Sequence, residues 1–560
     1  MAVTDVSRFT AGAGSSLSRQ AAWVFPHRLQ RFVRTAWTDH VGGKRRLARR
    51  RVGASGARPG PNAIRPYTEM SGRGTSPAAP ASFARFCRRI TEATPLGAFG
   101  GNVNTSAKST SGMNMHRLVK ALLVLSLLPL SAAAQTGSET VALEGARVID
   151  GTGRAAIESG TVLLRNGRFQ AVGGSGSVTI PQSARRIQLA GKTLMPALVD
   201  LHTHLGQTVN GLDPAPDAYN EQNLHAQLQR LLAYGVGTVV VMGTDRDLIY
   251  TLRAEQRAGK VEGARFFTAG RGFGMKGGFP GGAAMDWDVY RPVTPEEARA
   301  AVRELAAHHP DFVKIWLDDG YGRMPKMPPS IYGAVIDEAH RHHLRVVAHV
   351  YYLADAKGLI AAGVDELAHS IRDQSVDQEL VAAMKARNVM YLATLVRDES
   401  TFAYAEGPAW LSDTFFQAGL LASTLEKFQS AAFRQHAAQD PDLARNRASL
   451  EMGERNLKIL ADAGVRIGFG TDAGVPGRFL GYFEHRELQL MVMSGLTPLQ
   501  AIVCATHNAA AFLGNDFGTI EPGKRADFLV LDANPLEDIY NTEKLSAVWQ
   551  SGIPLKPIAK

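Results

Sequence analysis

Short apolar segments alternate with segments of helical periodicity over most of the chain after residue 194. Because the apolar segments carry no polar face, they indicate parallel strands that helices cover on both sides. About eight such strand–helix units predict an α/β fold of the (β/α)₈ TIM-barrel type. The strand-like segments include VGTVVVMG, DFVKIWL, LRVVAHV, VDELAHS, VMYLATLV and VRIGFGTDAG.

Glycine-broken strand patterns flank this region on both sides, and they predict a second, smaller module. We expect residues 135–196 and 515–560 to form a composite β-sandwich, with the barrel spanning residues 197–514. Residues 398–450 form a helical insertion between the seventh and eighth predicted strands, where a lid or specificity loop could lie. The glycine-rich segment 270–282 lacks Gly-Lys-Ser/Thr, so it is interpreted as an active-site loop after the third strand and not as a phosphate loop.

The first part of the chain has a different composition. Residues 1–112 are rich in Arg and Ser without sustained periodicity, and residues 113–134 show a basic start, an apolar stretch and an Ala-rich end. The second segment has the layout of a secretory signal peptide and is too short for a membrane span. We interpret residues 1–112 as a disordered leader that arises from a misplaced start site, with an organellar leader as the alternative. The mature protein would begin near Gln135, in the periplasm or outside the cell.

Charge and cysteine content exclude several function classes. The chain has a net charge of +10, but residues 1–112 alone contribute +14 and residues 135–560 carry −6. The part that folds is therefore mildly acidic, which argues against nucleic-acid binding. The two cysteines, Cys87 and Cys504, are too few for a disulfide framework or a thiolate metal site.

Two histidines end the strand in LMPALVDLHTHLG. Because side chains alternate along a strand, His202 and His204 point the same way and can hold one metal ion. The chain contains a second His-x-His, at His340 and His342, but it lies in a helical pattern where these positions diverge. We predict a solvated helix end there.

Polar side chains also lie in or directly after four other apolar strands. Each of them has an ordinary explanation if it is taken alone, such as a core histidine or a helix cap. Their occurrence at several strand ends together is improbable by chance, since the carboxyl ends of barrel strands carry the chemistry. Four histidines and one aspartate form a ligand set suited to zinc or a similar ion. The four further residues are Lys314, His349, His369 and Asp472.

The ordered set of these segments resembles the amidohydrolase superfamily, in the branch of imidazolonepropionase-like proteins and Xaa-Pro dipeptidases (prolidases). The resemblance runs from about Val141 to Pro554 and includes MPALVDLHTHLG, DFVKIW, VVAHV, GVDELAHS, GFGTDAG and GTIEPGKRADFLVLDANPLEDI. It implies a metal-bearing (β/α)₈ barrel with a small β-sandwich made from both chain ends.

The resemblance also assigns roles within a site for two divalent ions, expected to be Zn²⁺. It implies that Lys314 is carboxylated by CO₂ and bridges the two ions, which a bare lysine cannot do because it has no acceptor. Mononuclear members of the superfamily lack this lysine, so Lys314 favours two ions. The first ion would be held by His202, His204 and Asp472, and the second by His349 and His369.

The predicted function is that of an exported, metal-dependent amidohydrolase that cleaves amide bonds of dipeptides or N-acyl amino acids through a metal-activated hydroxide. Asp472, Lys314 and His369 are the predicted catalytic residues; Asp472 relays the proton, and His369 is the alternative base. A cyclic-amide hydrolase of the imidazolonepropionase type and a non-catalytic binding barrel are the alternatives.

Contacts to the substrate are predicted more weakly, from loop residues that follow strands. A tyrosine could donate to an oxyanion, and an arginine could bind a carboxylate. The expected partner is a small amide or dipeptide, with neither nucleic acid nor a stable membrane anchor after signal cleavage, and assembly into a homo-oligomer is left open. The candidate residues are Tyr351, Tyr352, Arg397 and Arg478.

Overall fold

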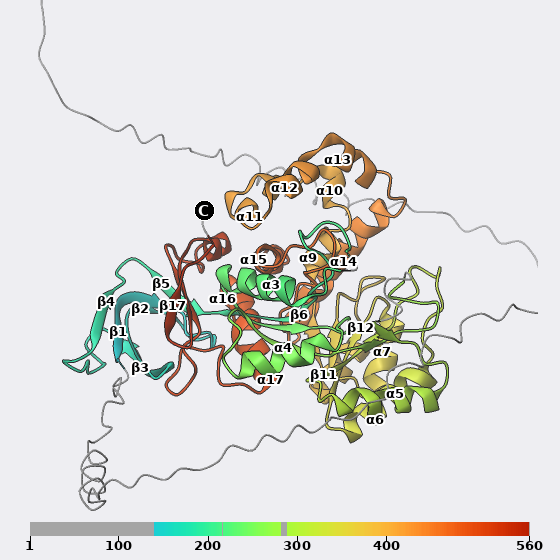
Figure 1. Cartoon of the computed structure of the whole chain (residues 1–560), viewed down its shortest axis with the longest axis horizontal. Helices are drawn as coiled ribbons and strands as arrows, with labels where there is room; N and C mark the ends of the chain where they lie inside the picture. Colours follow the sequence, from blue (N-terminus) through green and yellow to red (C-terminus); the bar gives the residue numbers. More distant parts are fainter. Residues whose placement is uncertain (1–138, 216, 282–287, 559–560) are drawn as a thin grey trace, which may run out of the picture. The chain divides into compact units, whose positions relative to one another are not determined.

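The computed structural model describes residues 139–215, 217–281 and 288–558 (Figure 1). All of them belong to one of the two units into which the chain divides, His116–Lys560. The predicted leader and signal peptide, Cys87 and the expected mature start at Gln135 lie outside the described residues, and those predictions stay untested.

A mixed sheet combines strands from both flanks of the chain, and Figure 1 shows these strands side by side. The flanks meet where β5 pairs antiparallel with β15, so they fold together as one module. These strands form a single sheet, and the predicted β-sandwich stays a prediction. The sheet has the order β17-β16-β15-β5-β1-β2-β3 with β4 on β1, and its strands are β1 (Val141–Val148), β2 (Ile157–Arg165), β3 (Arg168–Gly174), β4 (Arg185–Gln188), β5 (Thr193–Pro196), β15 (Phe528–Leu531), β16 (Leu545–Gln550) and β17 (Ile553–Leu555).

The strands between the flanks pair in parallel, which confirms the predicted α/β class. A three-stranded sheet has the order β6-β7-β8, and a six-stranded sheet has the order β10-β9-β11-β12-β13-β14. The strands are β6 (Leu198–Thr203), β7 (Val236–Val241), β8 (Arg265–Thr268), β9 (Gly272–Phe273), β10 (Val289–Tyr290), β11 (Phe312–Trp316), β12 (Arg345–His349), β13 (Glu366–Ala368) and β14 (Met390–Leu392).

The segment that was predicted as the eighth strand, VRIGFGTDAG, is irregular in the structure. It makes isolated parallel bridges, from Ile467 to Tyr391 of β14 and from Ala473 to Thr203 of β6. A left-handed residue, Asp472 with φ 58°, interrupts the extended backbone at the end of this segment. The segment therefore lies between the two parallel sheets without forming a regular strand of either.

Helices connect the parallel strands, as the periodicity predicts. The predicted cap of one of them is confirmed, because the Thr294 hydroxyl accepts a hydrogen bond from the Glu297 amide at 3.1 Å. The helices are α3 (Glu221–Ala233), α4 (Leu248–Arg257), α5 (Pro295–Ala307), α6 (Pro329–Arg341), α7 (Leu353–Ala362), α8 (Gln378–Arg387), α14 (Leu443–Asp462), α15 (Tyr482–Met493), α16 (Pro498–Val503) and α17 (Ala509–Leu513), with a π-helical turn η4 (Cys504–Asn508) and a 3₁₀ turn η5 (Ile539–Glu543).

The predicted seventh strand, residues 389–396, is shorter in the structure and ends at Leu392. The backbone turns at Thr394 with φ 48°, and the amides of Leu395 and Val396 donate to the Glu487 carboxylate at 3.0 and 2.7 Å. A distant carboxylate therefore starts a helix where the local pattern favoured a strand. The insertion that follows is helical, with α9 (Leu395–Glu399), α10 (Ala403–Glu406), η3 (Ala409–Ser412), α11 (Thr414–Ala418), α12 (Ala422–Gln429) and α13 (Ala431–Ala437).

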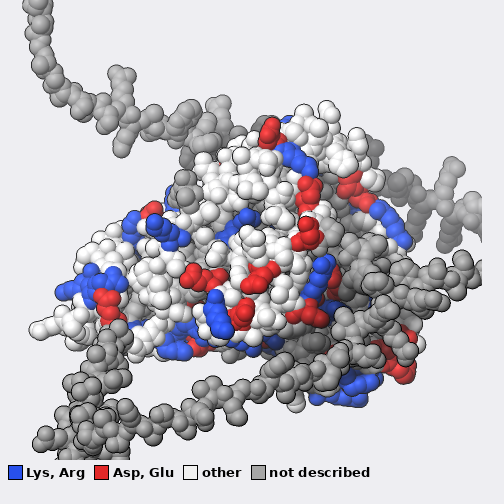
Figure 2. All heavy atoms as spheres, in the orientation of Figure 1, with Lys and Arg blue, Asp and Glu red and all other residues white. Residues whose placement is uncertain are grey.

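Basic and acidic side chains are interspersed on the face of the described part that Figure 2 shows. This mixture fits the mildly acidic charge of residues 135–560. Within the described ranges, none of the helices combines the length and the hydropathy needed to cross a membrane.

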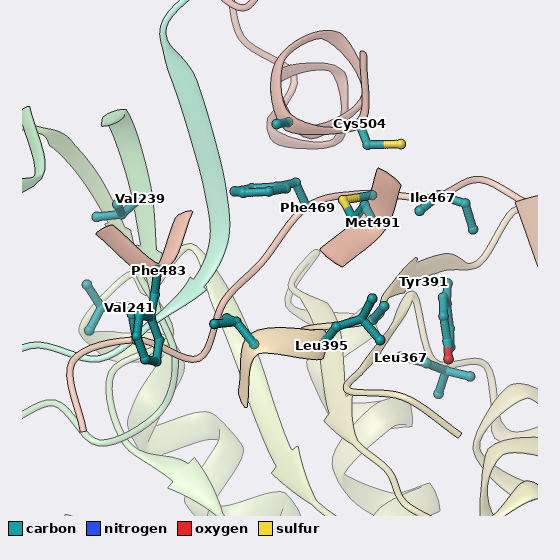
Figure 3. Packing of buried hydrophobic residues seen from close by; sticks show 14 of the residues in the cluster. Val239, Val241, Leu367, Tyr391, Leu395, Ile467, Phe469, Phe483, Met491 and Cys504 are labelled. Atoms are coloured by element: carbon teal, nitrogen blue, oxygen red, sulfur yellow. The ribbon is translucent and has the colours of Figure 1, made fainter. Parts of the chain in front are cut away.

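Both faces of the parallel strands are buried in apolar clusters. Val239 and Val241 of β7 lie in the cluster that also contains Phe483 and Met491 of α15 (Figure 3), whereas Val240 lies in a second cluster. That second cluster contains side chains from β6, β7, β11, β12, β13 and β14, so both parallel sheets contribute to one interior. Cys504 is buried in the first cluster as a free thiol, and burial raises its pKa to about 12.

Candidate active site

The structure brings the two histidines at the end of β6 together with Asp472. His204 Nε2 lies 2.9 Å from Asp472 Oδ1, and His202 Nε2 lies 3.6 Å from the same oxygen. A backbone hydrogen bond from the Asp472 amide to the His202 carbonyl, at 2.7 Å, holds the two segments together. Residues 270 positions apart in sequence are thus joined by both backbone and side chain.

His369 completes a group that could hold a metal ion. One donor atom from each of His202, His369 and Asp472 lies within 4.8 Å of the others, and all three residues are buried. The His202 and His369 rings lie 4.7 Å apart. Burial holds the pKa of both histidines well below the usual range, so the imidazoles are neutral and offer lone pairs.

Two of these residues have left-handed backbones, one directly after β13 and the other in the irregular segment 465–474. His369 has φ 74° and Asp472 has φ 58°. Such a conformation costs a non-glycine residue about 1–3 kcal/mol and persists only where its surroundings enforce it. Backbone strain at two residues of one cluster is typical of a functional site, where the directions of the side chains must be fixed.

Lys314 lies in the interior of β11, fully buried, with its Nζ 3.1 Å from His202 Nε2. Burial lowers the pKa of this lysine to about 7, which favours the neutral amine. Gly243, with φ 90°, packs against the lysine stem, since a Cβ there would lie 2.7 Å from Lys314 Cγ. The lysine is therefore held inside the site by close packing.

His349 ends β12 beside His369, with 4.4 Å between the ring centroids. Burial lowers the pKa of His349 to about 4, so this imidazole is neutral as well. Its Nε2 lies 2.7 Å from Asp318 Oδ2. The predicted histidine at the end of β12 thus joins the same cluster, together with Asp318, a carboxylate that was not predicted.

Hydroxyl groups orient two other imidazoles. Thr244 Oγ1 lies 3.0 Å from His204 Nδ1, and Thr394 Oγ1 lies 2.8 Å from His369 Nδ1. Because Nδ1 is engaged in each case, Nε2 is the nitrogen left to face the cluster. Such outer partners fix the ring orientation of metal-binding histidines.

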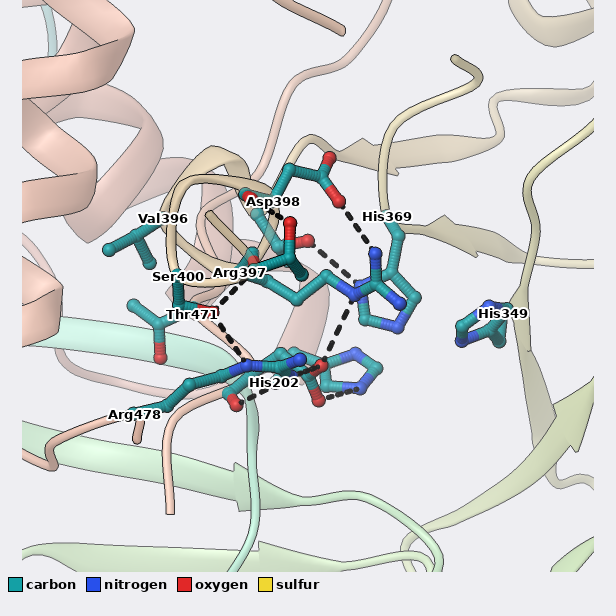
Figure 4. A network of polar contacts seen from close by, with 12 residues as sticks. His202, His349, His369, Val396, Arg397, Asp398, Ser400, Thr471 and Arg478 are labelled. Atoms are coloured by element: carbon teal, nitrogen blue, oxygen red, sulfur yellow. Dashed lines mark hydrogen bonds and ion pairs between the residues drawn. The ribbon is translucent and has the colours of Figure 1, made fainter. Parts of the chain in front are cut away.

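Three arginines lie around the Asp472 carboxylate and its neighbour Asp398. Arg372 is buried, whereas Arg397 and Arg478 are half-buried; Figure 4 shows the latter two beside Asp398. Arg478 pairs with Asp472 Oδ2, and Arg397 Nε lies 3.8 Å from that oxygen. Asp398 in turn pairs with Arg397 at 2.6 Å and with Arg372 at 3.3 Å. Burial alone would raise the pKa of Asp472, but the Arg478 guanidinium and the nearby imidazoles hold it well below the usual range.

The donor set fits a divalent metal ion. Neutral imidazoles and an ionised carboxylate are the forms that bind metals, and nitrogen and oxygen donors without cysteine suit zinc. Among the described residues, His202 Nδ1 is buried and has no hydrogen-bond partner, so these residues leave one nitrogen of the ring unsatisfied. The residues of the cluster are therefore suited to hold a metal.

Comparison with known proteins now decides the family. Residues 193–560 match the model of the amidohydrolase family over more than half of the chain. The chain belongs to the amidohydrolase family. Since amidohydrolases act on carbon–nitrogen bonds, the predicted enzyme class is confirmed at the level of the family.

Several named proteins are similar to this amidohydrolase. Ochratoxinase from Aspergillus niger is 28% identical over 270 residues, 46% of this chain, and the match spans about half of that relative, 48%. Imidazolonepropionase from Cereibacter sphaeroides is 26% identical over 425 residues, 70% of this chain and 92% of the relative. A solved structure from Bifidobacterium longum, described as that of a prolidase, has a TM-score of 0.59, with 26% identity and coverage of 75% of this chain and 95% of that chain.

The four residues that were predicted to contact the substrate fall into two groups in the structure of this amidohydrolase. Arg397 and Arg478 lie at the Asp472 carboxylate. The Tyr351 hydroxyl instead lies 3.1 Å from Ser449 Oγ, and the Tyr352 hydroxyl donates to Asp319 at 2.8 Å. Both tyrosine hydroxyls are thus engaged within the protein, and their contact with a substrate stays a prediction.

Two predicted loops reach the site from outside the strands. The insertion does so through Ser400, whose Oγ accepts a hydrogen bond from Arg478 Nε at 3.1 Å, and through the Tyr404 hydroxyl, which donates to the Gly477 carbonyl. The glycine-rich segment does so through Phe279, whose ring lies 5.0 Å from the His349 ring. The second His-x-His behaves as predicted, because His340 and His342 are exposed at the end of α6.

Sequence reasoning missed the residues that surround the predicted ligands. A signal was present for three of them, because Thr244 and Asp318 directly follow strand-like segments and Thr394 lies within one, like the predicted ligands. Arg372 and Asp398 carry no such signal, since they lie in loop and helix patterns that solvent-exposed residues share.

Proposed function

We propose that this amidohydrolase hydrolyses linear amide bonds of dipeptides or N-acyl amino acids at a site for two divalent metal ions, expected to be zinc. One observation carries the proposal: buried neutral imidazoles, a buried lysine and an ionised aspartate converge from separate segments of the chain. The prolidase description of the B. longum protein supports a dipeptide-like substrate.

The first ion would be held by His202, His204 and Asp472, and the second by His349 and His369. Lys314 would bridge them as a carbamate, and its lowered pKa supports this, because CO₂ reacts with the neutral amine. When bound, such ions acidify water and polarise a carbonyl oxygen.

Asp472 is placed to move the proton of the reaction. One carboxylate oxygen faces His202 and His204, and the other faces Arg478. Because its pKa is held low, Asp472 is ionised at neutral pH and can accept a proton from the attacking water. It would then pass that proton to the leaving nitrogen, as a general acid.

Arg397 and Arg478 bring positive charge to the same side of the site. Asp398 and Asp472 balance this charge in the structure. A substrate carboxylate could share these guanidinium groups, since arginine binds carboxylates through paired hydrogen bonds. This charge favours substrates with a free carboxylate, such as dipeptides and N-acyl amino acids.

We further propose that the two parallel sheets and the segment 466–473 close into the predicted (β/α)₈ barrel. The supporting observations are the bridges that this segment makes to β14 and β6 and the interior cluster that both sheets share. In such a barrel the strand ends that carry His202, Lys314 and His349 would form one mouth.

Export of the enzyme is the part of the proposal that rests on sequence alone. We expect the mature protein to begin near Gln135, because the Ala-rich end of the 113–134 segment resembles a cleavage site. N-terminal sequencing of protein exported by a bacterial host would measure this. An exported protein that still begins at Met1 would contradict both the start-site and the signal-peptide interpretations.

A second candidate is hydrolysis of a cyclic amide, which the long match to imidazolonepropionase favours. The two functions separate in one experiment, in which the zinc-loaded enzyme is given dipeptides, N-acyl amino acids and a cyclic imidazolone. We expect release of free amino acid from the linear substrates. Cleavage of the cyclic compound alone would favour the second candidate, and a zinc-loaded protein that cleaves none of them would favour a binding protein.

A further inference from the structure

Asp318 is a carboxylate in contact with His349, and it lies two residues after the end of β11, the strand that carries Lys314. Its Oδ2 accepts a hydrogen bond from His349 Nε2 at 2.7 Å, and its Oδ1 accepts one from the Gly320 amide at 2.8 Å. The side chains of Asp318 and His349 are both buried, with 9% and 2% of their respective areas exposed. The carboxylate is thus fixed by the backbone on one side and directed at the imidazole on the other.

The hydrogen bonds of Asp318 indicate which nitrogen of His349 carries the proton. Both carboxylate oxygens are engaged, Oδ1 by the Gly320 amide and Oδ2 by His349 Nε2. A carboxylate offers only acceptor sites, so the proton in the 2.7 Å bond belongs to His349 Nε2. A neutral imidazole that carries its proton on Nε2 has its lone pair on Nδ1.

This arrangement is opposite to that of two other histidines in the cluster. Threonine hydroxyls engage Nδ1 of His204 and of His369, which leaves Nε2 toward the site. At His349 the outer partner engages Nε2 instead. The His349 ring also contacts the rings of His369 and Phe279, whose centroids lie 4.4 and 5.0 Å away.

We propose that Asp318 is a positioning residue of the second metal site, which holds His349 in the tautomer protonated on Nε2 so that Nδ1 binds the ion. The proposal rests on the proposed two-metal function. Removal of an outer partner of this kind typically weakens metal binding about 10–100-fold. Asp318 would therefore act on the second ion through His349 and leave the first ion unaffected.

The neighbouring Asp319 provides a matched control. Its carboxylate accepts from the Tyr352 hydroxyl at 2.8 Å and pairs with Lys326 at 3.3 Å. It has the same charge and nearly the same place in the chain as Asp318, but the hydrogen bonds of its side chain go to groups other than the metal-site histidines.

The test is a zinc titration of the metal-free full chain that resolves both binding steps. For Asp318→Ala we expect one of the two zinc dissociation constants, that of the second ion, to rise about 10–100-fold while the other stays within about threefold. Asp318→Asn should lie between that variant and the wild type, because an amide oxygen can still accept the Nε2 proton. Asp319→Ala should match the wild type in both steps.

A ligand exchange at His349 gives an independent readout. An asparagine places its amide oxygen close to the position of Nδ1, whereas a glutamine reaches the position of Nε2. We expect His349→Asn to keep more of the second zinc ion than His349→Gln, and the order should reverse at His369.

Three results would overturn the proposal: equal weakening of both zinc ions in Asp318→Ala, a change below about threefold at the second ion, or better retention of zinc by His349→Gln. Failure of the proposed function looks different. A wild-type chain that binds two zinc ions, loses the second selectively in Asp318→Ala and hydrolyses no amide would support the role of Asp318 and refute the amidase activity.

Discussion

Replacement of Lys314 by alanine should lower the bound metal from about two ions per chain towards one and remove most of the hydrolytic activity. The variant loses the only proposed group that would contact both ions. The rate should fall by more than the roughly 10–100-fold loss that is typical when a residue that only hydrogen-bonds to a metal ligand is mutated. Elemental analysis and amide hydrolysis on the same preparation would measure both effects.

A surface lysine serves as the control for this variant. Lys357 is half-buried at the protein surface and pairs with Asp377 and Glu379, so Lys357→Ala should leave metal content and rate unchanged. Short carboxylic acids should partly restore Lys314→Ala, because they can take the place of the carbamate. Unchanged metal content and rate in Lys314→Ala would contradict the bridging role.

Asp472→Asn should lower the catalytic rate by at least roughly 10²–10⁴-fold, the usual worth of general acid–base catalysis. The amide keeps the shape of the side chain and can offer one oxygen to a metal, but it cannot accept and relay a proton. Binding of the substrate should change less, because most contacts come from the loops. The comparison of kcat with KM would separate the two effects.

The fold of Asp472→Asn should survive, because the backbone bonds that fix this segment do not involve the carboxylate. Asp213→Asn is a suitable control, since Asp213 is an exposed partner of Lys427. If Asp472→Asn keeps its metal and hydrolyses substrate within about threefold of the wild-type rate, the proton relay is assigned wrongly. His369 would then be the next base to examine.

The predicted ligands could be found from sequence because each of them places a polar group in an apolar strand, where burial is costly without a partner. His202 and His204 follow directly from the two-residue period of a strand. The structure brings His202, His369 and Asp472 together, although they lie up to 270 residues apart.

Other features depended on contacts that no local pattern shows. The predicted seventh strand is shortened because the Glu487 carboxylate binds the amides of Leu395 and Val396 from a distant helix. The segment before Asp472 reads as a regular strand, but the left-handed turn at Asp472 aims its carboxylate at the histidines. The role of Arg372 likewise appears only when Asp398 and Asp318 are both placed beside it.

The central claim is that this cluster of strand-end residues is a two-metal site that hydrolyses amides. Its most direct test is a titration of the metal-free chain with zinc, in which bound zinc and hydrolysis of a dipeptide are measured on the same samples. The account predicts no hydrolysis without metal and a rate that saturates at about two zinc ions per chain. Full hydrolysis by the metal-free chain, or saturation at one ion, would contradict it.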